Sequence, residues 1–205
     1  MEQRDTLRSL QQELARLRDE NRALKEEVAF LHSSIRALSA LQDVVQRLTP
    51  NMNLISFLDD LLASALAVVG ARDGSLLLLD DDTGEMAFAV VHGEARERLT
   101  GYRLAPGQGI AGWVAHYKVP QIVHDVQQDP RFSSAVDETF GFQTRSLACI
   151  PMLEGDRVLG VLEAINKVSD RPFTDVDHDL LVVVAQLAAV TILRAESFAA
   201  QTPAG

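Results

Sequence analysis

Residues 141–177 read GFQTRSLACIPMLEGDRVLGVLEAINKVSDRPFTDVD and hold two apolar runs separated by a polar turn. The runs, at 146–153 and 158–166, have the composition and length of buried strands. The residues between them, Glu154-Gly155-Asp156, have the chemistry of a tight turn. The stretch therefore predicts two long antiparallel strands joined as a hairpin.

A long helix is predicted after these strands, from about Asp175 to Ser197. Thr174 is a suitable N-cap, and Asp177 at the third helical position makes a relative of the capping box. Asp175 in the first turn also interacts favourably with the helix dipole. The longest apolar part of the helix, residues 180–193, is shorter than the roughly 20 residues that span a bilayer. We therefore expect no membrane contact.

The chain before residue 141 alternates short helices and short strands. An amphipathic helix is predicted from Leu54 to Val69, ending at Gly70. Apolar runs at 75–79 and 86–92 flank the turn Asp80-Asp81-Asp82-Thr83-Gly84, which predicts a second hairpin. Further predicted elements are a strand at 102–104, a helix at 110–117, a strand at 120–124 and a short helix at 134–140. Local hairpins with helices between them predict an α+β domain, a mostly antiparallel sheet covered by helices.

Residues 7–45 carry a heptad repeat of apolar side chains without Gly or Pro. Asn21 at an a position, with Val28 and Ile35 at later a positions, favours a parallel two-stranded coiled coil. The g–e′ pairs agree with this register: Glu13–Arg18, Glu20–Lys25 and Glu27–His32. The alternative is a helix folded back on its own domain. The predicted organisation is a dimerisation helix over 1–49, a globular domain over 50–197 and a disordered tail over 198–205.

The composition excludes several classes of protein. The 205 residues include 19 Lys and Arg against 29 Asp and Glu, and the net charge of −10 predicts no nucleic-acid partner. The single cysteine, Cys149, lies in an apolar run and allows no disulfide framework. The five histidines lack metal-ligand spacing, and no GxSxG motif presents a nucleophile. We therefore expect neither a metal site nor an enzyme. The N-terminus lacks a signal-peptide pattern, so we expect a cytoplasmic location.

The segment from Gly107 to Gly112 fits the pattern GxGxxG. A dinucleotide-binding fold would need a buried parallel strand directly before it, and the preceding residues do not form one. What remains is a glycine turn that leads into a helix. The N–H groups of Ile110 and Ala111 at the start of this helix are then free to accept a phosphate.

Several motifs follow one another in order: Ser75, GQGIAGWVA (107–115), DPRF (129–132), GFQTRSLACIPM (141–152), VLGVLEAINK (158–167), and Phe173 with Asp177. As a set over about residues 51–197, they resemble the GAF domain family. Asn166, Lys167, Phe173 and Asp177 resemble the NKFDE-type signature of GAF domains in cyclic-nucleotide phosphodiesterases and bacterial cyclases, with His178 in place of the final Glu. The resemblance implies that Lys167 and Asp177 pair structurally and do not touch ligand.

The resemblance also implies a pocket between the sheet and its covering helices, which holds a cyclic nucleotide in the phosphodiesterase-like members. Five positions keep the expected residue type: Ser75, Ile110, Ala111, Thr144 and Glu163. Four positions depart from the pattern: Val91 and His92 replace a Phe-Asp pair that holds the base, Ser133 replaces a tyrosine, and Phe140 replaces a threonine. These changes weaken the case for cyclic GMP, and we expect Phe140 to fill part of the pocket.

Three functional interpretations follow. The first is a dimeric sensor, in which a small ligand closes the pocket and the change passes through the terminal helices to a downstream signalling protein. The second is a structural dimerisation scaffold with a degenerate pocket. The third, an enzyme similar to GAF-type free-methionine sulfoxide reductases, is disfavoured because a thiol–disulfide cycle needs more than one cysteine. We expect the sensor, with a cyclic nucleotide as the first candidate ligand and no other cofactor.

Overall fold

The computed structural model describes residues 12–22, 24, 25, 28, 53–168 and 171–201, and the chain forms two compact units, Met1–Ala40 and Leu41–Gly205. In the first unit the described residues are helical. Four apolar side chains at predicted a and d positions are about half exposed there: Leu14, Leu17, Leu24 and Val28. Asn21, at another predicted a position, is also exposed. The remaining a and d positions lie outside the described residues, so pairing in a coiled coil stays a prediction.

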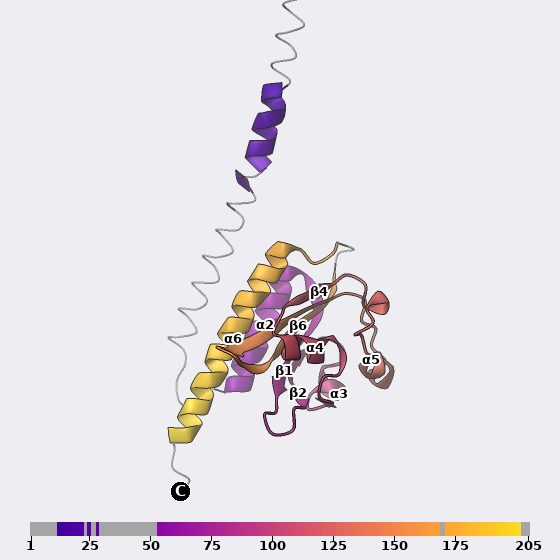
Figure 1. Ribbon diagram of the computed structural model, residues 1–205, viewed down its shortest axis with the longest axis vertical. Coiled ribbons are helices and arrows are strands. Elements are labelled where there is room, and N and C mark those ends of the chain that lie inside the picture. Colours follow the sequence, from indigo (N-terminus) through magenta and orange to yellow (C-terminus); the bar gives the residue numbers. More distant parts are fainter. Residues whose placement is uncertain (1–11, 23, 26–27, 29–52, 169–170, 202–205) are drawn as a thin grey trace, which may run out of the picture. The chain divides into compact units, whose positions relative to one another are not determined.

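The second unit is built around a six-stranded sheet with the strand order β3-β2-β1-β6-β5-β4, and every neighbouring pair is antiparallel (Figure 1). In chain order the elements are α2 (Leu54–Val69), β1 (Ala71–Leu79), β2 (Met86–His92), α3 (Arg96–Leu99), β3 (Arg103–Leu104), α4 (Gly109–Tyr117), β4 (Gln121–Val123), a 3-10 turn (Val126–Gln128), α5 (Ala135–Phe140), β5 (Leu147–Glu154), β6 (Arg157–Lys167) and α6 (Asp175–Gln201). The predicted α+β fold is confirmed.

Two element boundaries differ from the prediction by four residues, and α3 and the 3-10 turn were not predicted. Strand β1 begins at Ala71, four residues before the predicted start, because Asp73 and Gly74 pair with Ile165 and Ala164 of β6 although neither residue favours strands. Helix α6 continues to Gln201, so residues 198–201 of the predicted tail are helical. The remainder of the predicted tail lies outside the described residues.

Both faces of the sheet are covered. Helices α2 and α6 lie together on one side, and α4 and α5 lie on the other (Figure 1). Successive side chains of a strand point to opposite faces, and in β1 Leu76 accordingly packs into the cluster under α2 and α6, while Leu77 packs into the cluster with α4. A strand buried on both faces reads as a continuous apolar run, as residues 76–79 do.

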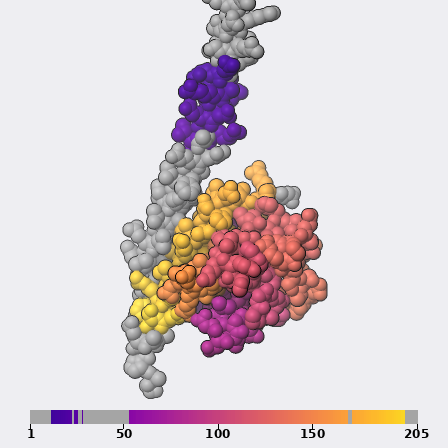
Figure 2. All heavy atoms as spheres, in the orientation of Figure 1, coloured from indigo at the N-terminus to yellow at the C-terminus, as the bar shows by residue number. Residues whose placement is uncertain are grey.

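Helix α6 is a core helix with one outward side. By length and composition alone the segment Asp175–Phe198 is apolar enough to cross a membrane, since an 18-residue window within it has a mean hydropathy of 1.8. No such segment was expected from the sequence. Its inner side is buried in the domain, including Leu181, Ala188 and Ile192. Val190 is 40% exposed, and part of the helix stays on the domain's surface (yellow and light orange in Figure 2). Core helices of globular domains have this pattern.

The start of α6 is fixed by the cap expected from the sequence. The backbone N–H and the hydroxyl of Thr174 donate to Asp177 Oδ2 over 2.8 and 2.9 Å, and the N–H of Asp177 donates to Thr174 Oγ1 over 3.3 Å. Lys167 Nζ, at the end of β6, donates to the same Asp177 carboxylate. Phe173 is buried, with its ring centre 5.4 Å from Lys167 Nζ. The predicted Lys167–Asp177 pair therefore joins the last strand to the last helix.

Candidate functional site

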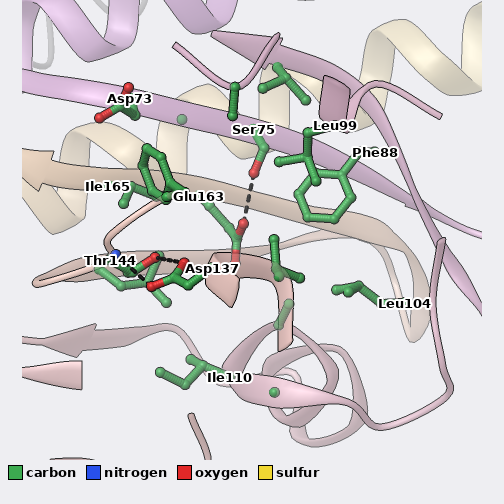
Figure 3. Close-up of a pocket in the computed structure, with 18 of the residues that line it drawn as sticks. Asp73, Ser75, Phe88, Leu99, Leu104, Ile110, Asp137, Thr144, Glu163 and Ile165 are labelled. Carbon is green, nitrogen blue, oxygen red and sulfur yellow. Dashed lines mark hydrogen bonds between the residues drawn. The ribbon is translucent and has the colours of Figure 1, made fainter. Parts of the chain in front are cut away.

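A cavity of about 90 Å³ lies between the sheet and the helices on the α4 side. Its walls come from β1, β2 and β6, from the segment that includes α3, from the start of α4, and from α5 with the loop before β5 (Figure 3). Eight of the nine predicted ligand-binding residues line it: Ser75, Val91, His92, Ile110, Ala111, Ser133, Thr144 and Glu163. Ser75 and Glu163, which lie 88 positions apart in the sequence, are thus brought together.

Phe140 is the exception, and its predicted place in the pocket is wrong. Its ring packs edge-on against Tyr102, with ring centres 5.1 Å apart. Phe142 lines the cavity instead. The cause is Gly141, which ends α5 in the left-handed conformation (φ 64°) and turns the chain before Phe142.

Ser75 and Glu163 form a buried pair on the floor of the cavity. They lie opposite each other in the β1–β6 ladder, and Ser75 Oγ donates to Glu163 Oε2 over 2.7 Å (Figure 3). Burial raises the pKa of the Glu163 carboxyl, and the hydrogen bond from Ser75 opposes that rise. The protein's own hydroxyl therefore holds one of the two carboxylate oxygens.

Thr144 is held by an acid that the sequence did not indicate. Its N–H and its hydroxyl donate to the two oxygens of Asp137 over 2.7 and 2.8 Å. Asp137 lies on α5 and also lines the cavity. Asn166 fixes the same loop, because its Oδ1 accepts from the N–H of Arg145 and its Nδ2 donates to the carbonyl of Gln143, both over 2.8 Å. Asn166 is thus a positioning residue, consistent with its predicted structural role.

The N-terminus of α4 borders the cavity, with Gly109, Ile110 and Ala111 among the lining residues. The first hydrogen bond of the helix runs from the N–H of Gly112 to the carbonyl of Gln108, so the N–H groups of Ile110 and Ala111 precede the helical ladder. The side chain of Gln108 does not cap the helix and accepts instead from the N–H of Ala105. Gly112 is required here, since a Cβ would lie 2.3 Å from the carbonyl carbon of Gly107.

Asp73 is a second acid that the sequence did not indicate. It is 4% exposed and lines the cavity, on the same face of β1 as Ser75 two positions on. Its Oδ1 has no hydrogen-bond partner among the described residues. Burial raises the pKa of the Asp73 carboxyl. The backbone N–H of Glu94, the charge of Arg72 and the side chain of Asn166 oppose this only in part.

Cys149 lies opposite Glu163 in the β5–β6 ladder and is fully buried. Burial, together with the charge of Glu163, raises the pKa of its thiol well above the ordinary value, so it is poorly suited to act as a thiolate. Among the described residues no group of three or more histidine, cysteine or acidic side chains is arranged to hold a metal ion.

Comparisons with known proteins agree with this architecture. The family model for the GAF domain matches residues 53–192, more than half of the chain. The chain belongs to the GAF domain family. Solved GAF structures share its fold: the GAF domain of a phosphoenolpyruvate-protein phosphotransferase from Coxiella burnetii superposes with a TM-score of 0.70 at 23% identity, covering 81% of this chain and 98% of that one.

Other relatives of this GAF domain differ in activity. The free methionine-R-sulfoxide reductase of Neisseria meningitidis, solved with its substrate, has a TM-score of 0.64 at 20% identity over 78% of this chain and 89% of that one, which is a likeness of fold alone. The mouse cone cGMP-specific 3',5'-cyclic phosphodiesterase subunit alpha' is 37% identical over 84 residues, 41% of this chain. A dual 3',5'-cyclic-AMP and -GMP phosphodiesterase 11A of Takifugu rubripes is 38% identical over 96 residues, 46% of this chain. The matches span about a tenth of either phosphodiesterase.

Proposed function

We propose that this GAF domain is a non-catalytic sensor that binds a small ligand in the cavity beside α4. The observation that carries the proposal is the combination of α4 N–H groups ahead of the helical ladder with buried polar side chains in one enclosed space. Such N–H groups donate hydrogen bonds to anions, and the helix dipole adds to this attraction. The hydroxyl of Thr144 and the carboxyl of Glu163 supply further polar contacts on the opposite walls.

Two observations support the absence of turnover. The single cysteine is buried and its pKa is raised, and a thiol–disulfide cycle like that of a reductase needs at least two thiols. Two acids of the cavity, Glu163 and Asp137, already accept hydrogen bonds from Ser75 and Thr144.

Cyclic nucleotides are the first candidates, because the phosphodiesterase relatives act on them and because Ile110 and Ala111 can receive a phosphate. The cavity of about 90 Å³ is small beside the roughly 300–1,000 Å³ of typical ligand pockets. A nucleotide would therefore require α5 and the segment around α3 to move outward. That movement is the means by which binding would be passed on.

The sensor is proposed to act as a cytoplasmic homodimer, joined by a parallel coiled coil over residues 7–45, that signals to a partner protein. The support is the heptad with its single polar a position at Asn21. Light scattering of the full chain at micromolar concentration should give twice the mass of one chain. A monomer under these conditions would contradict the dimer.

Calorimetry with cyclic AMP, cyclic GMP and cyclic dinucleotides tests the binding proposal. For any of them that binds the parent protein, we expect Thr144→Ala to weaken that binding about 10-fold, since a hydroxyl and the loop that it fixes are lost. Thr139→Ala is the matched control: Thr139 is also tied to α5, through the carbonyl of Ala135, but does not line the cavity.

The two negative outcomes have different meanings. Binding that Thr144→Ala leaves unchanged would place the ligand elsewhere. No heat with any ligand, in this panel or in the panel described below, would favour the structural scaffold with a degenerate pocket.

A further inference from the structure

The ionisable side chains that line the cavity are mostly acidic. Asp73, Asp137 and Glu163 are lining residues, and in the described lining His92 is the one basic side chain, with neither lysine nor arginine. Two of the acids are hydrogen-bonded by the protein, Glu163 by Ser75 and Asp137 by Thr144. Asp73 differs, because its Oδ1 lacks a partner among the described residues although the side chain is 4% exposed.

A buried carboxylate oxygen without a partner is costly, because it loses hydration and gains nothing in return. The backbone nevertheless makes room for it. Gly93 has a φ of +114°, and a Cβ at this position would lie 2.1 Å from Asp73 Oδ1. The β2–α3 connection thus leaves space for an acid with one oxygen, Oδ1, that has no donor among the described residues.

We propose that the ligand of this cavity carries a protonated amine, amidine or guanidine nitrogen that pairs with Asp73. This inference rests on the proposed function, since it assigns a ligand class to the same cavity. A charge-assisted hydrogen bond from such a nitrogen is stronger than a neutral one and compensates the burial of the carboxylate. The ligand's donor group thereby completes the set of partners that Ser75 and Thr144 begin.

The anion-accepting N–H groups lie elsewhere in the cavity. Asp73 lies beside β1 on one side of the cavity, and Ile110 lies at the start of α4 on the other (Figure 3). A molecule that satisfies both ends carries a cation and an anion that are separated, as amino acids and their relatives do. The volume of about 90 Å³ suits a molecule of that size. A cyclic nucleotide brings a negative phosphate but no cation at neutral pH, so it leaves Asp73 unpaired.

Thermal unfolding of the full chain with matched pairs of probes tests this ligand class. The probes are the protein amino acids with uncharged side chains, each paired with the α-hydroxy acid that has the same side chain. The hydroxy acid keeps the size and the carboxylate and lacks the cationic amine. Cyclic AMP and cyclic GMP are included. We expect at least one amine-bearing probe to raise the Tm by about 3–6 °C at about ten times its Kd, and its hydroxy-acid partner to have no effect.

Asp73→Asn separates a ligand-binding role from a structural one. It replaces the carboxylate by a neutral amide of the same shape, so we expect the Tm without ligand to stay level or to rise at pH 7.5. The affinity for the effective probe should fall by about 10-fold or more. Asp137→Asn is the matched stability control. It should lower the Tm, because both oxygens of Asp137 accept hydrogen bonds from Thr144.

Four outcomes would overturn the inference. The first is that no amine-bearing probe stabilises the parent protein. The second is that an effective probe stabilises the parent and Asp73→Asn equally. The third is that Asp73→Asn lowers the Tm as much as Asp137→Asn does, which would make Asp73 a structural residue. Binding of a cyclic nucleotide to both proteins would reject this ligand class and leave the sensor function standing. If no probe of either kind binds, both proposals fail.

Discussion

The two faces of the sheet are built from different kinds of residue. Under α2 and α6 the buried cluster is apolar, and Thr191, the buried polar residue of α6, donates its hydroxyl to the carbonyl of Leu187 in its own helix. On the α4 side the buried residues include Asp73, Ser75 and Glu163. Polar groups are rarely buried unless they have partners. The α2 and α6 face therefore contributes most to the stability of the fold. On the α4 face, burial of polar groups costs stability, and we propose that a ligand uses these groups.

The largest effect that would test this contrast is expected from a truncation in α2. Leu62→Ala should lower the free energy of unfolding by about 2–5 kcal/mol, because Leu62 is fully buried and leaves a cavity. The matched control is Val68→Ala in the same helix, where the side chain is 66% exposed, and it should change the free energy by about 0.5 kcal/mol or less. Denaturant unfolding measures both values.

A large loss in Val68→Ala would contradict this account of α2, since it would mean that its outer side is covered in solution. A small loss in Leu62→Ala would contradict the assignment of the α2 and α6 side as the stabilising face. The ligand-binding experiments on the opposite face should be unaffected by Val68→Ala.

Most of the fold could be predicted from the sequence because it depends on local signals. The hairpins follow from apolar runs and turn residues, and the cap at Thr174 follows from spacing alone. The early start of β1 could not be predicted, because Asp73 and Gly74 have low strand propensity. They are part of the strand because they pair with β6. The same tertiary effect hid Asp73 as a site residue.

The site was predictable where a motif carried it and not elsewhere. Ser75, Thr144 and Glu163 were found through the ordered motifs, and the structure brings them to one cavity. Asp137 gave no signal, because in sequence it is an ordinary acid of a short polar helix and its role depends on Thr144, seven residues later. Phe140 was misplaced because the pattern does not reveal that Gly141 turns the chain and sends Phe142 inward.

The smallest effect is expected from Glu163→Gln, which tests the pocket face through its pH dependence. Burial raises the pKa of Glu163 above the ordinary value of 4.5. Between the unfolded and folded pKa values the folded state holds a proton that the unfolded state has released. The free energy of unfolding of the parent therefore falls as the pH rises above about 4.5. Gln keeps an acceptor for Ser75 and does not titrate. The free energy of unfolding of the variant should therefore lack the part of the pH-dependent decrease that is due to Glu163.

Unfolding measured from pH 4 to pH 8 should thus show the difference between Glu163→Gln and the parent moving steadily in favour of the variant. A residual fall of the same sign is expected in the variant, because the pKa of Asp73 is also raised by burial. Glu97→Gln on α3, away from the cavity lining, is the control and should run parallel to the parent. If Glu163→Gln also ran parallel to the parent, the buried acids would cost the fold nothing. The contrast between a stabilising face and a ligand-binding face would then rest on packing alone.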